Sequence, residues 1–212
     1  MDTIKIIPHV DGYDPNPNLW QDETLTKTWN VNTDTFTHKL NECFNILTRC
    51  KKFKELSLCA FDNNKHIGVR LIEPLENFVN GLTIEHFDKY RTDLDLKPFI
   101  GCYEYGINIV HQWIVINNID INTVAHFCGL AVDPNYRKIG LGTELVKQSL
   151  KHLRIHNYQY VVVETTGDYS RKIMEKYQAC KLGFINYKTY CEGNDYPAIV
   201  DHEEFGVYYI KL

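Results

Sequence analysis

The stretch from residue 126 to residue 143 holds the residue types and spacing best suited to binding a phosphate group. An apolar strand leads into a turn and a basic pair, Arg137-Lys138, and then Gly140 and Gly142 open directly into a helix. The first turn of a helix has backbone N–H groups without intrahelical partners, and the helix dipole adds partial positive charge there. Glycines let an anion approach the backbone, and the basic pair adds full charges beside it. The stretch therefore predicts a loop that binds phosphate oxygens.

The helix that follows this loop is predicted to reach about His156 and to bury one face. At helical spacing its apolar face consists of Leu141, Leu145, Val146, Ser149, Leu150 and Leu153. The opposite face consists of Glu144, Lys147, Gln148, Lys151 and Arg154. Because the apolar face must pack on a core, we expect this helix to hold the loop in place.

Two common phosphate loops do not fit this stretch. A dinucleotide-binding loop needs the pattern Gly-x-Gly-x-x-Gly with an acidic residue about 20 positions further on. Here Thr143-Glu144-Leu145 follows Gly142, so the third glycine is missing. The Lys-Ser/Thr pair of a nucleoside-triphosphate loop is missing as well.

Composition sets broad limits. The 212 residues suffice for one domain with a sizeable core, and the formal charge of −4 (23 minus 27) gives no sign of a nucleic-acid-binding surface. No apolar run approaches the roughly 18 residues of a membrane span. Seven scattered cysteines without a Cys-x-x-Cys pair, and no early apolar signal segment, lead us to expect reduced cysteines and a cytoplasmic protein. Nine histidines lack ligand spacing, so we expect no metal.

The hydrophobic pattern predicts strands and helices in mixed order, including a hairpin around the turn Asp62-Asn63-Asn64-Lys65. Strands are predicted at about 4–10, 56–61, 66–72, 124–132, 158–164, 185–191 and 205–212. Helices are predicted at about 19–25 and 35–50, in a mostly helical insertion at about 76–121 that includes 85–94, and after the phosphate loop. A last helix is expected to be capped by Asp168 or Ser170 and ended by Gly183. These elements describe a mixed sheet with helices on both faces.

Two motifs resemble the GNAT acetyltransferase superfamily. The run Arg137-Lys138-Ile139-Gly140-Leu141-Gly142 resembles its acyl-CoA pyrophosphate loop, Arg/Gln-x-x-Gly-x-Gly/Ala, at every specified position. The superfamily's later Gly-Phe pair is matched by Gly183-Phe184.

Within the superfamily, the chain resembles the insect-type arylalkylamine (dopamine) N-acetyltransferases and their relatives at three places. Asp22-Glu23-Thr24-Leu25 is similar to that family's Asp-Glu-Pro-Leu, and Ile67-Gly68-Val69 to its Val-Gly-Val strand. Thr166-Gly167-Asp168-Tyr169-Ser170-Arg171 is similar to the turn before its last helix. Ser170 and Gly183 lie about five residues further apart than in that family, so the last helix is expected to be longer here.

The resemblance implies a GNAT-like α/β (α+β) fold, with a mixed, mostly antiparallel central sheet and helices on both faces. It implies a single N-acetyltransferase domain over residues 1–212, with an acyl-CoA-binding part at about 124–184 and the inserted helical segment at about 76–121. The implied co-substrate is acetyl-CoA, and its contacts are expected from Leu130, Ala131, Val132, Arg137, Lys138, Ile139, Gly140, Leu141, Gly142 and Thr143.

The implied partner is a small primary amine of the arylalkylamine type, bound by a monomer or homodimer. Alternatives are a polyamine or a protein amine as acceptor, or an acyl-CoA-binding module without catalysis. No cysteine is obviously placed as an acyl carrier, which favours direct attack in a ternary complex. Aromatic candidates for the amine pocket, for which core packing is an equal alternative, are Phe78, Phe87, Tyr103, Tyr105, Trp113 and Tyr196.

Acetyl transfer to an amine first requires that the ammonium group lose a proton. An amine with a pKa near 10.4 is about one part in 10³ neutral at pH 7, a handicap of about 4–5 kcal/mol. A carboxylate can act as the base when burial raises its pKa towards neutrality. The resemblance assigns this role to Glu23, for which the alternative is an ordinary acidic residue at a helix start.

The remaining steps need a proton donor for the coenzyme A thiolate and an N–H donor for the thioester oxygen. Tyr177 and Ser170 are candidates for the acid, with core packing and a helix N-cap as their alternatives. The resemblance gives the N–H donor to the strand backbone at residues 130–132. Strand alternation gives His126 the face shared with Cys128 and Leu130, as a core histidine or a proton relay.

Overall fold

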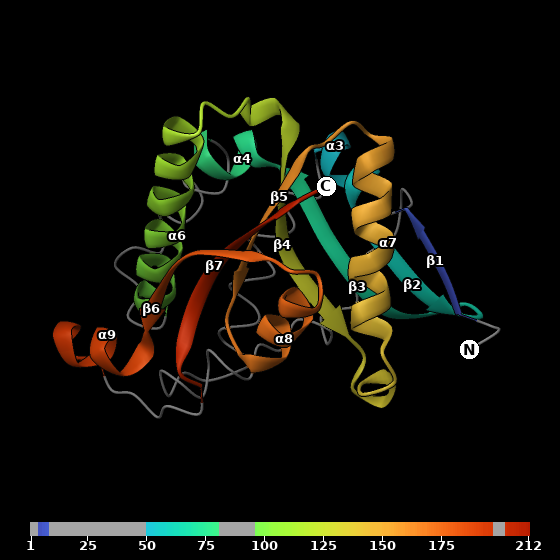
Figure 1. The fold of residues 1–212 in the computed structure, drawn as a ribbon. Coiled ribbons are helices and arrows are strands. Elements are labelled where there is room, and N and C mark those ends of the chain that lie inside the picture. The colour runs from blue at the N-terminus through green and yellow to red at the C-terminus, as the bar shows by residue number, and fades with distance from the viewer. Residues whose placement is uncertain (1–3, 9–49, 81–95, 197–201) are drawn as a thin grey trace.

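The computed structural model describes residues 4–8, 50–80, 96–196 and 202–212, and within them one seven-stranded sheet organises the chain (Figure 1). The strand order is β1-β2-β3-β4-β5-β7-β6. The strands are β1 (Ile4–Pro8), β2 (Leu58–Asp62), β3 (Lys65–Pro74), β4 (Val124–Val132), β5 (Tyr160–Thr165), β6 (Cys180–Asn186) and β7 (Glu204–Lys211). Only β4 and β5 are parallel among these neighbours, so the expected mixed, mostly antiparallel sheet is confirmed.

Helices pack on both faces of the sheet, as expected (Figure 1). One cluster of buried side chains joins α4, α6 and α9 to the sheet, and a second joins α7 and α8 to its other side. The helices are α3 (Lys51–Leu56), α4 (Leu75–Asn80), α6 (Lys97–Ile116), α7 (Leu141–Ile155), α8 (Asp168–Lys176) and α9 (Tyr187–Asn194), with single 3-10 turns η2 (Ile121–Thr123) and η3 (Pro134–Tyr136). No helix in these described segments is long and apolar enough to cross a membrane.

Several sequence-based predictions are confirmed. The hairpin is present as β2 and β3, with Asn63 in the left-handed conformation that its tight turn requires (φ 53°). Helix α7 buries the six residues of its predicted apolar face, and the described parts of the predicted insertion form α4 and α6. The predicted helices at 19–25, 35–50 and 85–94 lie outside the described residues, apart from Cys50, which is the N-cap of α3.

The predicted strand at 185–191 is wrong beyond Asn186. Residues 187–194 form α9, although several of them have high β propensity. The side chain of Asn186 accepts a hydrogen bond from the Thr189 N–H at 3.1 Å and caps the helix. Tyr187 and Cys191, four positions apart, are both buried, which suits a helix.

The end predicted for the last helix at Gly183 is also wrong. Helix α8 ends at Lys176, and Gly183 lies within β6. Gln178 takes a left-handed conformation (φ 55°) and donates its N–H to the Glu175 carbonyl, while the next N–H reaches back to Met174. This pair of bonds is a Schellman motif, which sequence reasoning missed because glycine usually occupies the position of Gln178.

The Schellman motif generates a stability prediction. Replacing Gln178 with Gly should raise the free energy of unfolding by about 0.5–1 kcal/mol, because glycine adopts the left-handed conformation without strain. That corresponds to a rise of about 1–4 °C in Tm for a chain of this size. As a matched control, Gln148→Gly within α7 should lower Tm. Equal Tm changes for the two variants would contradict the assigned helix end.

Candidate active site

The loop after β4 is tied to the hairpin of β2 and β3. The Asp133 N–H donates to the Ile67 carbonyl at 2.8 Å, and the Asp133 carboxylate contacts the Lys65 ammonium group at 2.9 Å. The Tyr136 hydroxyl donates to the Asp62 carboxylate at 2.8 Å. These contacts place the following residues at a fixed point beside the end of the sheet.

The loop backbone then turns so that the start of α7 is open. Lys138 (φ 64°) and Gly140 (φ 90°) are left-handed, and residues 137–140 are exposed. The first hydrogen bond of α7 runs from the Glu144 N–H to the Gly140 carbonyl, so the N–H groups of residues 141–143 precede the helical ladder. The loop thus combines exposed residues with helix-start N–H groups that have no intrahelical partner, as expected of an anion-binding site.

The two parallel strands separate next to this loop. β4 pairs with β5 from Val124 and Tyr160 to Phe127 and Val163, and β4 then continues to Val132 without a ladder partner on that side in the described structure. Figure 1 shows β4 and β5 diverging, with α8 beyond the opening. The backbone of β4 beyond Phe127 therefore faces an opening in the sheet.

Two of the three backbone amides predicted as donors face this opening. Asp133 bonds to β3, and hydrogen bonding alternates along an antiparallel ladder, so the N–H of Ala131 is also directed to β3. The N–H groups of Leu130 and Val132 are directed to the open side. The Val132 carbonyl on that side accepts a hydrogen bond from the Arg137 Nε at 3.2 Å.

A bulge in β4 corrects the predicted position of His126. The register with β3 changes from Gly129 opposite Leu71 to His126 opposite Glu73, which leaves one extra residue in β4. The extra residue reverses the alternation, so Leu130 packs in the cluster that contains α7, whereas His126 packs against α4 and α6. The prediction that His126 and Leu130 share a face is therefore wrong.

His126 lies buried between two carboxylates. Its Nδ1 is 2.9 Å from the Glu73 Oε1, and its Nε2 is 2.6 Å from the Glu164 Oε2. The three side chains are 0%, 0% and 6% exposed. The Phe78 ring packs on the imidazole with centroids 3.9 Å apart, and the Tyr103 ring contacts it edge-on. We call Glu73, His126 and Glu164 the carboxylate–histidine row.

The row holds His126 in its charged form. Burial acts to lower the pKa of His126, but the Glu164 and Glu73 carboxylates outweigh it and raise the pKa to about 9. The imidazolium therefore donates to one carboxylate from each ring nitrogen at neutral pH. Sequence reasoning named His126 but missed Glu73 and Glu164, which lie 53 and 38 positions away from it and carry no local motif.

Within the described residues, Glu73, His126 and Cys128 form the one cluster of histidine, cysteine and carboxylate atoms compact enough for a metal, within 4.8 Å of one another. Both ring nitrogens of His126 already contact carboxylates, so we assign this cluster to the row. Burial raises the pKa of the Cys128 thiol well above its usual value, which keeps it protonated and unreactive.

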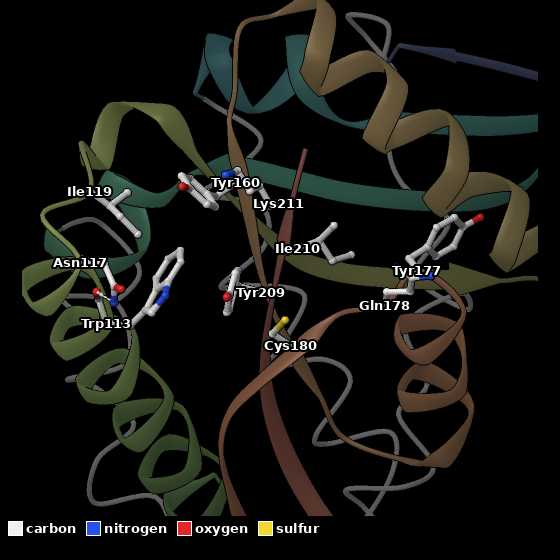
Figure 2. Close-up of a pocket in the computed structure, with 10 residues that line it drawn as sticks. All are labelled: Trp113, Asn117, Ile119, Tyr160, Tyr177, Gln178, Cys180, Tyr209, Ile210 and Lys211. Carbon is white, nitrogen blue, oxygen red and sulfur yellow. Dashed lines mark hydrogen bonds between the residues drawn. The ribbon is translucent and has the colours of Figure 1, made fainter.

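The two candidate acids hydrogen-bond to nearby backbone. The Tyr177 hydroxyl donates to the Thr143 carbonyl in the first turn of α7 at 3.0 Å, and Figure 2 shows its ring directed to α7. Burial raises the pKa of Tyr177, so this phenol stays protonated. The Ser170 hydroxyl donates to the Gly167 carbonyl at 2.8 Å; Gly167 is the N-cap of α8, so the predicted capping by Asp168 or Ser170 is wrong. Glu23 lies outside the described residues.

A cavity of about 530 Å³ lies between α6, the end of α8 and the sheet (Figure 2). Its walls include Trp113, Tyr160 and Tyr209, and the Trp113 and Tyr209 rings stack with centroids 4.7 Å apart. Tyr160 is the first residue of β5, whereas Glu164 is near its other end. The cavity is therefore at the far end of β5 from the carboxylate–histidine row.

Comparison with known proteins assigns the chain to a family. The model of the acetyltransferase (GNAT) family matches residues 18–184, which include the loop, the opening between the strands and the carboxylate–histidine row. No curated protein matches the sequence.

Solved structures share the fold at low sequence identity. Arylalkylamine N-acetyltransferase 2 from Aedes aegypti is 17% identical, with a TM-score of 0.71 over 98% of each chain. A polyamine N-acetyltransferase from Drosophila melanogaster, described as forming N-acetylagmatine, is 13% identical, with a TM-score of 0.60 over 99% of this chain and 100% of its own. A GNAT acetyltransferase from Elizabethkingia anophelis, solved with acetyl-CoA bound, is 15% identical, with a TM-score of 0.51 over the whole of both chains.

The left-handed turn at Gly140 generates a prediction about the loop. A Cβ at Gly140 would meet no atom within 4 Å, so Gly140→Ala introduces backbone strain and no clash. We expect it to lower the free energy of unfolding by about 1–2 kcal/mol, or to shift the loop and weaken binding of coenzyme A. In the control Gly142→Ala, the Cβ would lie at ordinary contact distances of 3.6–3.8 Å from Ile173, Leu130 and Val132. If Gly140→Ala matches Gly142→Ala in both Tm and calorimetric affinity, the turn does not require glycine.

The raised pKa of His126 generates a prediction about pH. The folded chain binds a proton at His126 that the unfolded chain loses above its ordinary pKa of 6.5. The stabilisation that this bound proton gives is therefore complete below pH 6.5 and is lost as pH rises through about 9. From the pKa difference it is about 3 kcal/mol, measurable by urea unfolding between pH 6 and 10. His126→Gln should remove this dependence, whereas His111→Gln, at an exposed position of α6, should keep it.

Proposed function

We propose a reaction for this chain from the premise that it belongs to the acetyltransferase (GNAT) family, which it matches over residues 18–184. It is thereby an N-acetyltransferase, and its family uses acetyl-CoA. We propose that it transfers the acetyl group to a small primary amine of the arylalkylamine type, by direct attack of the amine in a ternary complex. A single domain over residues 1–212, with the acyl-CoA-binding part at about 124–184 and the helical insertion at about 76–121, would carry this reaction.

The observation that carries this proposal is that β4 connects an open strand edge to an open helix start. The amides of Leu130 and Val132 face the opening between the strands, and the same chain leads through the exposed residues 137–140 to α7. A ligand with a diphosphate at one end and a thioester carbonyl at the other suits both groups of donors. We propose that the full cofactor contact set is Leu130, Ala131, Val132, Arg137, Lys138, Ile139, Gly140, Leu141, Gly142 and Thr143.

The proposed chemistry consists of proton transfers and the exchange of a carbon–sulfur bond for a carbon–nitrogen bond. Glu23 takes a proton from the ammonium group, directly or through water, and the neutral nitrogen attacks the thioester carbonyl carbon. The backbone N–H groups of β4 stabilise the oxygen as it gains negative charge. The carbon–sulfur bond then breaks, Tyr177 or Ser170 supplies a proton to the thiolate, and the second proton of the nitrogen passes to the deprotonated acid and restores it, while Glu23 releases its proton to water. The bond from Tyr177 to Thr143 supports a place for this phenol beside the cofactor loop.

An arylalkyl group is supported by the aromatic side chains near the opening. Phe78 and Tyr103 pack around His126, and Phe99 packs against Tyr103. The fold neighbours include proteins that act on arylalkylamines and one that acts on polyamines. If no arylalkylamine is acetylated, the acceptor would be a polyamine or a protein amine, or the chain would bind acyl-CoA without turnover.

We further propose that the chain acts in the cytoplasm, as a monomer or homodimer. No disulfide joins any two of the six cysteines in the described residues, which supports a reducing compartment.

The proposed function predicts both binding and turnover. Calorimetry should detect acetyl-CoA binding, and a panel of arylalkylamines, polyamines and peptides should show release of free thiol with at least one arylalkylamine. Glu23→Gln should keep the affinity for acetyl-CoA and lower kcat by about 10²-fold or more, because the amine loses its base.

Three results separate the alternatives. Failure to bind acetyl-CoA would refute the whole assignment. Binding without turnover across the panel would indicate a non-catalytic module. Turnover that Glu23→Gln leaves intact would show that another group takes the proton.

A further inference from the structure

Within the part of the chain that the structure describes, each carboxylate of the carboxylate–histidine row has one oxygen without a hydrogen-bond partner. These oxygens are the buried Glu73 Oε2 and Glu164 Oε1, while the other oxygen of each bonds to His126. A buried acceptor left unpaired costs about 1–3 kcal/mol, and more when it is charged. The row is therefore incomplete without a donor from elsewhere.

Glu164 lies where a donor bound to its carboxylate would be close to the proposed site of acetyl transfer. It is the first residue of β5 after the pairing with β4 ends at Val163. In β4, Cys128 is likewise the first residue after the pairing ends, and the unpaired amides of Leu130 and Val132 follow two and four positions further along the strand. The Glu164 carboxylate is thus at the base of the opening, on the side of α6, whereas the phosphate-binding loop leads into α7 on the other side.

A glycine keeps α6 from covering this carboxylate. A Cβ at Gly106 would lie 3.5 Å from the Glu164 Cγ and 3.7 Å from its unpartnered Oε1. Any side chain there would occupy the space next to that oxygen. Gly106 is a mid-helix residue with no positive φ, so local backbone geometry does not call for glycine at this position.

We propose that the row is the binding site for the ammonium group of the acceptor amine, with Glu164 contacting it and His126 and Glu73 as positioning residues. The inference rests on the proposed function and adds that the substrate is recognised as a cation. An alkylammonium group offers three N–H donors, which suit a carboxylate oxygen without a partner.

The charge of the row favours a cation over a neutral donor. Two carboxylates and one imidazolium leave a net charge of −1, which a neutral hydrogen-bond donor would not compensate. Arg70 is the buried cation nearby and interacts electrostatically with Glu164, but its guanidinium carbon stacks 3.8 Å over the Phe127 ring, and its Nε and Nη2 make no hydrogen bond to any described residue. The other groups around His126 are uncharged, namely Phe78 from α4, Tyr103 from α6 and the Cys128 thiol.

The test compares each ammonium ion with the alcohol of the same skeleton. Calorimetry on the full chain saturated with coenzyme A measures Kd for 2-phenylethylamine against 2-phenylethanol, and for butylamine against 1-butanol. In the wild type at least one ammonium ion should bind 10-fold or more tightly than its alcohol. Glu164→Gln should weaken the binding of that ion by about 10- to 100-fold and change the Kd of the alcohol by less than about 2-fold. Glu192→Gln, at an exposed position of α9, is the matched control and should change neither.

Two further variants keep the proposal testable if Glu164→Gln does not fold. Gly106→Ala keeps every charge and should weaken ammonium binding by about 3-fold or more, because its methyl group takes space beside the Glu164 Oε1. Glu73→Gln keeps the shape of that side chain and removes one negative charge from the row, so it should lower the ratio of ammonium to alcohol affinity without changing the Kd of the alcohol, which a merely structural role would not do.

The outcomes for the two proposals are distinct. If the wild type shows no preference for either ammonium ion, or if Glu164→Gln and Gly106→Ala both keep the preference, the row is not the ammonium site. Failure to bind acetyl-CoA refutes the acetyltransferase assignment instead, and is measured separately on the same preparation.

Discussion

The separation of β4 from β5 after Phe127 and Val163 is the constraint on which the site depends. A parallel pair that continued would satisfy the amides of Leu130 and Val132, and no backbone donor would remain for a ligand. The strands can part because each is held on its outer side. β3 pairs with β4 as far as Val132, and β7 pairs with β5 as far as Thr165. The bulge in β4 lies at the same level and lets the strand change direction without losing β3.

The parts of the fold that were predictable from the sequence are those set by local pattern. The apolar spacing of α7 identified its buried face residue by residue, and the Asn63 turn identified the hairpin, because both signals extend over a few neighbouring positions. The turn between β4 and α7 was recognisable for the same reason, since its glycines and basic residues are neighbours in the sequence, and its binding of phosphate stays a prediction. The end of α8 and the start of α9 were missed because capping by Gln178 and Asn186 overrode the usual propensities.

The carboxylate–histidine row could hardly be predicted from the sequence. One extra residue in β4 reverses which face each later side chain takes, and no residue type marks that bulge. Glu73 and Glu164 come from strands on either side of β4, so only the strand order β3-β4-β5 brings them to His126. Until the register was known, neither residue could be distinguished from any other glutamate as a partner of His126.

Opposite charge on the two sides of the opening gives a physical reason for this arrangement. The exposed Arg137 and Lys138 and the α7 dipole favour a polyanion on one side, whereas Glu73 and Glu164 with a single imidazolium favour a cation on the other. A diphosphate would be repelled from the row, and an ammonium ion from the loop. In the proposed reaction the two ligands would therefore be sorted by charge before any specific contact forms. Since β4 lies between the two sides and its open amides face the gap, the proposal has the thioester and the amine meet where the strands part.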